Sequence, residues 1–328
     1  MAENATPPLV ELAVVRRSGL LESRHLGALF ALDAAGNPAA ELGDVDAPVL
    51  PRSTTKPLQA LACLSVGAPL EGPALAIAAG SHTGTDAHVE VVRTVLAEAG
   101  LTEDALRCPV DWPEDEPTRN SLVRAGQERS RVRMNCSGKH AAMLLACRVN
   151  GWSTEGYLET THPLQQRVRA VTAEFTEAPV THDAVDGCGA PLFATTVRGL
   201  ATAFRALQRA AASEPAGRVA AAMRAHPEFV GGHGHANTEV MRRVPGTVAK
   251  GGAEGVIGLA GPDGQAVAMK IIDGNPRATT LLALEVLTAL GVDVSEAADL
   301  RVVPVLGGGV RVGEVAPGAA VQAWVAAR

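Results

Sequence analysis

The order of strand-like and helix-like segments is the feature that most limits the folds open to this chain. Short apolar segments of strand length come first, at 8–15 and 26–32, and the turn signal at 33–37 leads into a third. Segments of the same kind return in the last third, at 248–257, 266–272, 302–306 and 310–315. Strands at both ends of a chain predict an α+β fold, in which one antiparallel sheet flanked by helices takes strands from both termini.

The middle of the chain has helix-like periodicity. Helices are expected to begin after Thr85 or Asp86 and near Pro191, and to occupy 58–66, 140–148, 200–212, 216–224 and 278–290. The apolar run 74–79 has the length of a buried strand, so we predict a strand there. Segment 109–133 is polar and contains prolines, which predicts a surface excursion.

Composition limits the class of protein. With 328 residues and 47% hydrophobic content, the chain can form one domain spanning 1–328 or two closely packed lobes with an active cleft between them. The net charge is −6 and aromatics are 3%, with no basic cluster, so we expect no nucleic-acid partner. No apolar stretch is long enough to span a membrane, and segment 1–15 lacks a secretion signal. We therefore expect a cytoplasmic protein without a membrane partner, whose five cysteines stay reduced.

Lysine is rare in this chain. Only four of the 29 basic residues are lysine, and the other 25 are arginine. A buried lysine can lose its proton and act as a base or ligand, whereas arginine cannot. Lys56, Lys139 and Lys250 lie in serine-bearing or glycine-rich segments, so they are candidates for positions that need an amine. A composition bias towards arginine explains the rarity but not these surroundings.

Ser53 and Lys56 are three residues apart. On a helix these positions share a face, so the amine could take the proton of the serine hydroxyl. Pro57 disfavours a helical conformation at Lys56, which makes a tight turn before the helix an alternative. Capping of the helix by Ser53 or Thr54 also explains the residues.

Ser81 follows the predicted strand 74–79 and precedes a helix. Gly80 and Gly84 would let the backbone approach a ligand, and amides at a helix start can stabilise developing negative charge. An ordinary turn, capped by Thr83 or Thr85, is an equally simple explanation.

Cys136 and Cys188 each lie in a polar, glycine-bearing turn that opens onto a predicted helix. The same turns carry an amine, an imidazole and a carboxylate, which are Lys139, His140 and Asp186. Together these groups could hold Zn²⁺ through soft ligands and leave a position open. Neither turn has the Cys-x-x-Cys spacing, and a lysine ligand must first lose its proton. Reduced cysteines in polar turns, or a disulfide formed on purification, are the alternatives.

Other polar residues have simpler explanations. Lys250 precedes two glycines and looks like an inward-facing lysine at the end of a strand. Lys270 lies in an alternating apolar segment, where burial beside Asp273 would account for it. His233 and His235 could suggest a metal, but a mobile glycine-rich loop also explains them.

Five segments together resemble the asparaginase II family, typified by the inducible rhizobial-type L-asparaginases. They are 52–57, 80–84, 135–140, 186–191 and 249–255. The resemblance runs over nearly the whole chain. It implies an architecture similar to serine β-lactamases and glutaminases, L-asparagine as the substrate and a homodimer.

The resemblance also implies roles for individual residues. Ser53 with Lys56 and Ser81 with Lys250 would form two Ser-Lys tandems. Zinc ligands and substrate-binding residues are implied as well: Cys136, Lys139 and Cys188 for zinc, and Arg52, Asn135, His140 and Asp186 for the substrate. His235 departs from the family loop, which usually carries an arginine at its position, so substrate affinity or choice could differ.

The resemblance predicts hydrolysis of the side-chain amide of L-asparagine to L-aspartate and ammonia. A serine hydroxyl, Ser53 or Ser81, would attack after a lysine removes its proton. Zinc would orient the substrate and is not required for the chemistry. The alternatives are a related serine amidohydrolase acting on glutamine or a β-lactam, a zinc or thiol sensor, and a non-catalytic amino-acid-binding protein.

Overall fold

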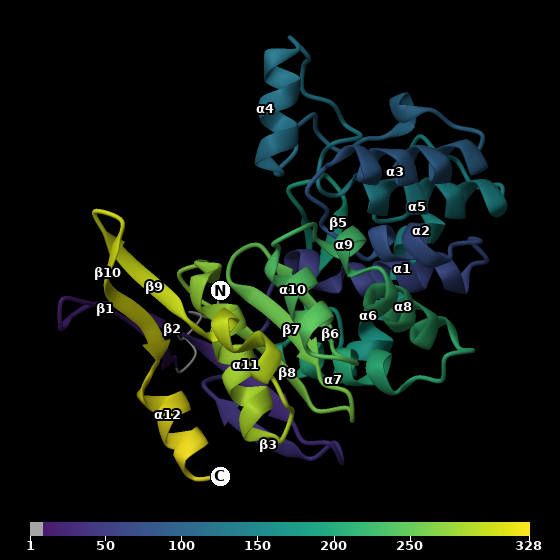
Figure 1. Cartoon of the computed structure of the whole chain (residues 1–328). Helices are drawn as coiled ribbons and strands as arrows, with labels where there is room; N and C mark the ends of the chain where they lie inside the picture. Colours follow the sequence, from purple (N-terminus) through teal and green to yellow (C-terminus); the bar gives the residue numbers. More distant parts are fainter. Residues whose placement is uncertain (1–8) are drawn as a thin grey trace, which may run out of the picture.

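Both ends of the chain build one sheet (Figure 1). The computed structural model describes residues 9–328. The strands of the sheet are β1 (Val10–Arg17), β2 (Leu20–Leu32), β3 (Pro38–Leu42), β6 (Val248–Gly252), β7 (Val256–Ala260), β8 (Ala266–Ile271), β9 (Val303–Gly307) and β10 (Val310–Pro317). All neighbours are antiparallel in the order β6–β7–β8–β2–β1–β10–β9, and β3 pairs with β2. The predicted α+β class, with strands from both termini, is confirmed.

Most of the helices connect the two groups of strands, whereas the last two lie between β8 and β9 and after β10. They are α1 (Lys56–Ser65), α2 (Gly72–Ala78), α3 (Asp86–Glu98), α4 (Glu116–Arg124), α5 (Ser137–Val149), α6 (Pro163–Thr176), α7 (Val197–Arg209), α8 (Pro215–Ala225), α9 (Pro227–Val230), α10 (Ala236–Arg243), α11 (Thr279–Ala289) and α12 (Ala319–Ala326). A small separate sheet pairs β4 (Asp183–Val185) with β5 (Pro191–Phe193).

The central strands are covered by helices. Every residue of β7 is buried, and both α7 and α11 pack on it. Gly258 in β7 lies so close to α7 that a Cβ atom would meet the Phe204 ring at 2.4 Å. Burial of both faces explains why β7 reads as a continuous apolar run and not as an alternating one.

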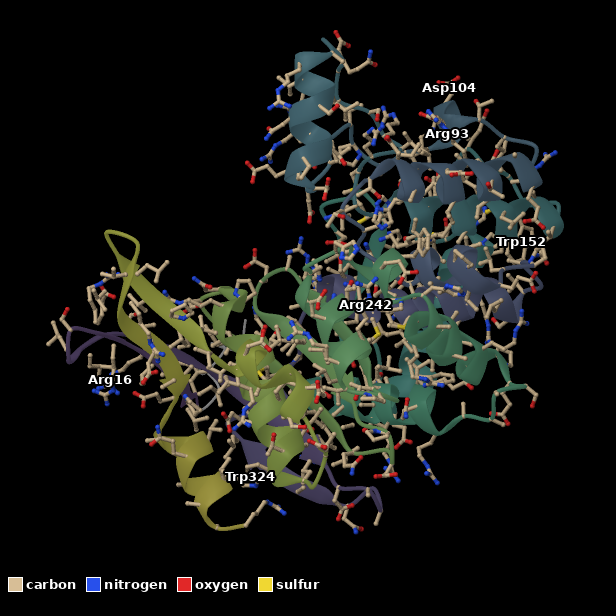
Figure 2. The ribbon with its side chains drawn as sticks, in the orientation of Figure 1. Arg16, Arg93, Asp104, Trp152, Arg242 and Trp324 are labelled. Carbon is tan, nitrogen blue, oxygen red and sulfur yellow. The ribbon has the colours of Figure 1, made fainter. Side chains whose placement is uncertain are left out.

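The helical half packs around α5, whose residues from Ser137 to Cys147 are all buried. Helices α1, α2, α3 and α6 pack against it. Figure 2 shows Arg93, Asp104 and Trp152 in this half, Arg16 and Trp324 on the side of the sheet, and Arg242 between them. The segments with the predicted catalytic residues lie where the helical half meets β6.

Two sequence predictions of secondary structure are wrong. Residues 74–78 belong to helix α2, not to a strand, and Ala79 is its C-cap. This helix packs against α3, α5, α8 and α9, and its residues 75–78 are all buried, so they show no polar face that would reveal the helical period. The helix expected near Pro191 is strand β5, and the next helix, α7, begins later with the Thr196 side chain accepting from Gly199 N–H.

Three smaller expectations also changed. The predicted strand 248–257 is a hairpin of two strands, β6 and β7. The surface excursion 109–133 contains helix α4, whose cap is Asp115. Lys270 is half-buried but donates to the backbone oxygen of Glu254, whereas Asp273 is bonded to His25.

The amino-terminal segment searched for a secretion signal lies partly outside the description, since residues 1–8 are not among the described residues. Within 9–328, none of the helices has both the length and the apolar character needed to cross a bilayer.

Candidate active site

A cavity of about 610 Å³ opens between the helical half and β6. Four of the predicted site residues line it: Ser53, Ser81, Asn135 and Lys250. They come from four stretches of chain that are far apart in the sequence, so the fold gathers them at one place. Of the other predicted residues, Lys56 and Cys136 form side-chain hydrogen bonds to this wall. The rest do not line the cavity: Arg52, Lys139, His140, Asp186 and Cys188.

Ser53 lies on a one-turn 3₁₀ helix, Arg52–Thr55, directly before α1. Arg52 has a φ of +51°, a left-handed conformation that is strained for a residue with a side chain. The turn packs tightly on β6, since a Cβ atom on Gly252 would meet Thr54 Oγ1 at 2.8 Å. Strand β6 and this turn are therefore fixed relative to one another, which fixes Ser53 relative to Lys250.

Lys56 reaches Ser81 and not Ser53. Its Nζ donates to Ser81 Oγ at 2.9 Å and to the backbone oxygen of Asn135 at 3.3 Å. In residues 9–328, no side-chain hydrogen bond joins Ser53 to Lys56 or Ser81 to Lys250. The observed Ser-Lys contact thus crosses between the two implied tandems.

The capping alternatives have different outcomes. Neither end of the Ser53 turn has a side-chain cap, so capping by Ser53 or Thr54 is wrong. Thr85 does cap α3, by accepting from the backbone N–H of His88. Ser81 itself is held by its backbone N–H, which donates to Val230 O at 2.8 Å, and this leaves its hydroxyl for Lys56.

Lys250 is 1% exposed and has no carboxylate partner among the described residues. Its Nζ donates to the backbone oxygen of Gly251. Burial, together with the positive charge of Lys56, lowers the pKa of Lys250 well below its ordinary value. This lysine on the cavity wall therefore gives up its proton more readily than an exposed lysine.

Arg52 and Asp186 connect the Ser53 turn to the cysteine turns. Arg52 Nε donates to Asp186 Oδ1 at 2.7 Å. Burial opposes ionisation of this carboxyl, but the charge of Lys139 and the Arg52 hydrogen bond together lower the pKa of Asp186. Asp186 is thus a carboxylate held between two cations.

Cys136, Lys139 and Cys188 form a buried cluster behind Asn135. Lys139 Nζ donates to Cys188 Sγ at 3.0 Å, and Cys136 Sγ lies 3.1 Å from Asn135 Oδ1. The Cys136 thiol and the Lys139 amine beside it lower the pKa of Cys188 to about 5, against the opposing effect of burial. Proximity to Cys188 and burial raise the pKa of Cys136 to about 12. Cys188 is the thiolate of the cluster.

This donor set suits a soft cation such as Zn²⁺. Two sulfurs and one amine face one another, and the thiolate is already formed. Within 9–328, no three His, Cys, Asp or Glu side chains are grouped to hold a metal, so Lys139 is needed as the third ligand. Burial would lower the pKa of Lys139, but the charges of Cys188, Cys136 and Asp186 raise it, so the ion must displace a proton.

His140 is fully buried next to this cluster. Its Nδ1 is 2.7 Å from Tyr157 Oη, and its Nε2 has no hydrogen-bond partner among the described residues. Burial and the charge of Lys139 lower the pKa of His140 to about 3, so the ring is neutral. A neutral imidazole with one free nitrogen can donate to or accept from a bound polar group.

The cavity residues that the sequence prediction missed include Asn237 and Glu114. Asn237 is 2% exposed and lines the cavity, with Oδ1 accepting from Gly251 N–H at 2.8 Å and Nδ2 unpartnered in the described part of the chain. Glu114 lines the cavity from the excursion before α4. Asn237 lies two residues after His235 in the family loop, so a sequence motif could have identified it. Glu114 lies in no such motif.

The two histidines of that loop do not meet. His235 lines the cavity and caps α10, with Nδ1 accepting from Asn237 N–H. Burial and Lys250 lower the pKa of His235 to about 4. His233 is exposed and contacts Arg242. His235 therefore replaces the charge of the family arginine with a neutral ring.

The model of the L-asparaginase II family matches residues 13–317, and the chain belongs to this family. The resemblance seen in the motifs is confirmed. The chain is accordingly an amidohydrolase whose substrate is a small-molecule amide. Among curated proteins, none is similar enough to this chain to count as a significant match.

Solved structures similar to this one include three hydrolase- or synthase-type proteins. A β-lactamase from Mycobacterium bovis is 17% identical, with 84% of this chain and 93% of that chain covered and a TM-score of 0.42. A Bacillus glutaminase is 14% identical, with 82% and 92% covered and a TM-score of 0.37. A simvastatin synthase from Aspergillus terreus is 12% identical, with 83% and 92% covered and a TM-score of 0.35.

Proposed function

We propose that this protein is an L-asparaginase that hydrolyses the side-chain amide of L-asparagine to L-aspartate and ammonia. One observation carries the proposal: in a member of the L-asparaginase II family, Lys56 Nζ is 2.9 Å from Ser81 Oγ at the wall of a cavity that Ser53 and Lys250 also line. A hydroxyl beside an amine is the arrangement that produces an activated serine.

The first half of the reaction forms an acyl-enzyme. A serine oxygen attacks the amide carbon while its proton passes to a lysine amine, and a tetrahedral oxyanion results. When it collapses, the carbon–nitrogen bond breaks, the leaving nitrogen takes the proton and ammonia departs. Ser81 is the first choice of nucleophile because it has the lysine contact, and Ser53 is the alternative.

The second half returns the serine. Water gives a proton to the same amine and attacks the ester carbon, and the serine oxygen leaves with a proton as aspartate forms. Lys250 suits the role of base in both halves, because its lowered pKa favours the unprotonated amine, which can accept a proton. Lys56 holds the Ser81 hydroxyl in position in both half-reactions through their hydrogen bond.

Zinc would bind at the cysteine cluster, with Cys136, Lys139 and Cys188 as its ligands. When bound, the ion would supply a positive charge that orients a polar group of the substrate. Arg52, Asp186, His140 and Asn135 surround the same region and would bind the substrate through hydrogen bonds. Serine chemistry does not depend on the ion.

Ammonia release tests this function. The purified protein should release ammonia from L-asparagine faster than from L-glutamine, and should hydrolyse a β-lactam much more slowly. Pretreatment with a chelator should raise the KM for asparagine, by roughly 10-fold, and leave kcat within about 3-fold, because the ion orients but does not attack. No ammonia release from any of these amides would overturn the proposed function.

A further inference from the structure

Glu114 is a carboxylate on the wall of the same cavity as Ser81, Asn135 and Lys250. It reaches this place from the polar excursion before α4. The base of the excursion is closed by a bridge between Asp111 and Ser130. No part of the reaction described above uses Glu114.

Its two neighbours in the chain hold Glu114 against the Ser81 turn. Asp115 N–H donates to Thr83 O at 3.0 Å, two residues beyond Ser81. Pro113 is buried against Gly84, where an added Cβ atom would approach its ring at 2.9 Å. The carboxylate is therefore positioned by the same turn that positions the serine.

The carboxylate of Glu114 is exposed, and its one side-chain hydrogen-bond partner in the described chain is uncharged. Asn135 Nδ2 donates to its Oε1 at 2.6 Å, which is a neutral partner. Asp299, the other carboxylate that lines the cavity, is paired with Arg243. Among residues 9–328, no cation lies within ion-pair distance of Glu114. One negative charge thus faces the cavity beside the serine.

We propose that Glu114 binds the α-ammonium group of the substrate and so restricts the site to free α-amino acids that carry a side-chain amide. This inference rests on the proposed function and names its substrate class. In asparagine the ammonium nitrogen is separated from the amide carbon by two carbons, so a carboxylate beside the nucleophile can reach it. A charge-assisted hydrogen bond between carboxylate and ammonium is stronger than a neutral one.

The alternative role of Glu114 is only to orient Asn135. Glu114→Gln distinguishes binding of the ammonium group from orientation of Asn135, because the amide oxygen still accepts from Asn135 while the charge is lost. The substrates are L-asparagine and succinamic acid, which has the same amide and carboxylate but hydrogen in place of the ammonium group. Glu116→Gln, an exposed carboxylate in the first turn of α4, is the matched control.

We expect wild type to prefer asparagine over succinamic acid in kcat/KM, and Glu114→Gln to reduce this preference by roughly 10- to 100-fold, mostly through the KM for asparagine. Hydrolysis of succinamic acid should stay within about 3-fold, and Glu116→Gln should match wild type. Equal losses of kcat/KM for both substrates would overturn the proposal. Such losses would result if Glu114 only orients Asn135, or if its charge acts through the pKa of Lys250. An unchanged preference for asparagine would also overturn the proposal.

Binding of the products keeps this test separate from the proposed function. By calorimetry, wild type should bind L-aspartate more tightly than succinate, and Glu114→Gln should lose the difference. Such a result without any ammonia release would overturn the asparaginase activity and leave the role of Glu114 standing. No preference for L-aspartate in wild type would overturn the role of Glu114, whatever the activity.

Discussion

Replacing Ser81 with alanine is expected to lower kcat for asparagine by about 10⁴-fold or more, the size of effect that follows removal of a nucleophile. The fold should survive, because the Ser81 backbone N–H still donates to Val230 O and only the Lys56 contact is lost. Ser53→Ala should also be severely impaired, because Ser53 lines the same cavity on a strained turn. Steady-state ammonia release and thermal unfolding check both variants.

Ser121→Ala is the matched control for these variants, since Ser121 is exposed on α4 and has no contact with the cavity. It should retain wild-type kcat and KM. Full activity in both Ser81→Ala and Ser53→Ala would contradict a serine nucleophile.

Replacing Lys250 with methionine is expected to abolish turnover and to stabilise the fold. Activity falls because the amine that we propose as acceptor of the serine proton is gone. Stability rises because methionine fills the same buried space without a group that must leave water or lose a proton. We expect the free energy of unfolding at pH 7 to rise by about 1–2 kcal/mol, a typical value when a buried functional group is replaced.

The pH dependence of stability tests whether the lowered pKa of Lys250 causes this gain in the free energy of unfolding. The pKa of Lys250 in the folded protein lies below the ordinary lysine value of 10.5, so between the two values the unfolded chain binds one more proton. This lysine therefore makes the wild type less stable as pH falls from about 10.5, and Lys250→Met should remove that part of the slope. Wild-type activity should fall at low pH as Lys250 becomes protonated.

Lys270→Met is the control, since Lys270 is half-buried and its one side-chain hydrogen bond in residues 9–328 is to the Glu254 backbone oxygen. It should change neither activity nor the slope of stability against pH to a comparable extent. A Lys250→Met variant that unfolds more easily than wild type, or that keeps its turnover, would count against a neutral buried amine.

Many strands, helices and turns of the fold were predictable because local sequence patterns specify them. Strands at both ends of the chain signalled a shared antiparallel sheet, and the Asp33 turn is formed as expected, with Gly36 N–H donating to Asp33 O. The failure at α2 has a physical reason: Leu75, Ala76 and Ile77 are all buried among other helices. With no exposed face, a helix and a buried strand have the same pattern of apolar residues.

The candidate site was predictable as a set of residues but not as a set of contacts. Glycine, serine and lysine in short motifs marked Ser53, Ser81 and Lys250. Which lysine meets which serine depends on how α1 and the Ser81 turn pack, and the observed contact is Lys56 with Ser81. Glu114 carried no motif, since it enters the cavity only through the tertiary contacts of its neighbours.

The most direct test of the central claim, that a lysine-contacted serine becomes acylated, is rapid-quench mass spectrometry. The protein is mixed with L-asparagine, quenched in acid during turnover and digested. The account predicts an aspartyl ester on the peptide carrying Ser81, or on that carrying Ser53, and none in the corresponding alanine variant. Turnover with no serine ester at any quench time, and with solvent oxygen entering aspartate in one step, would contradict it.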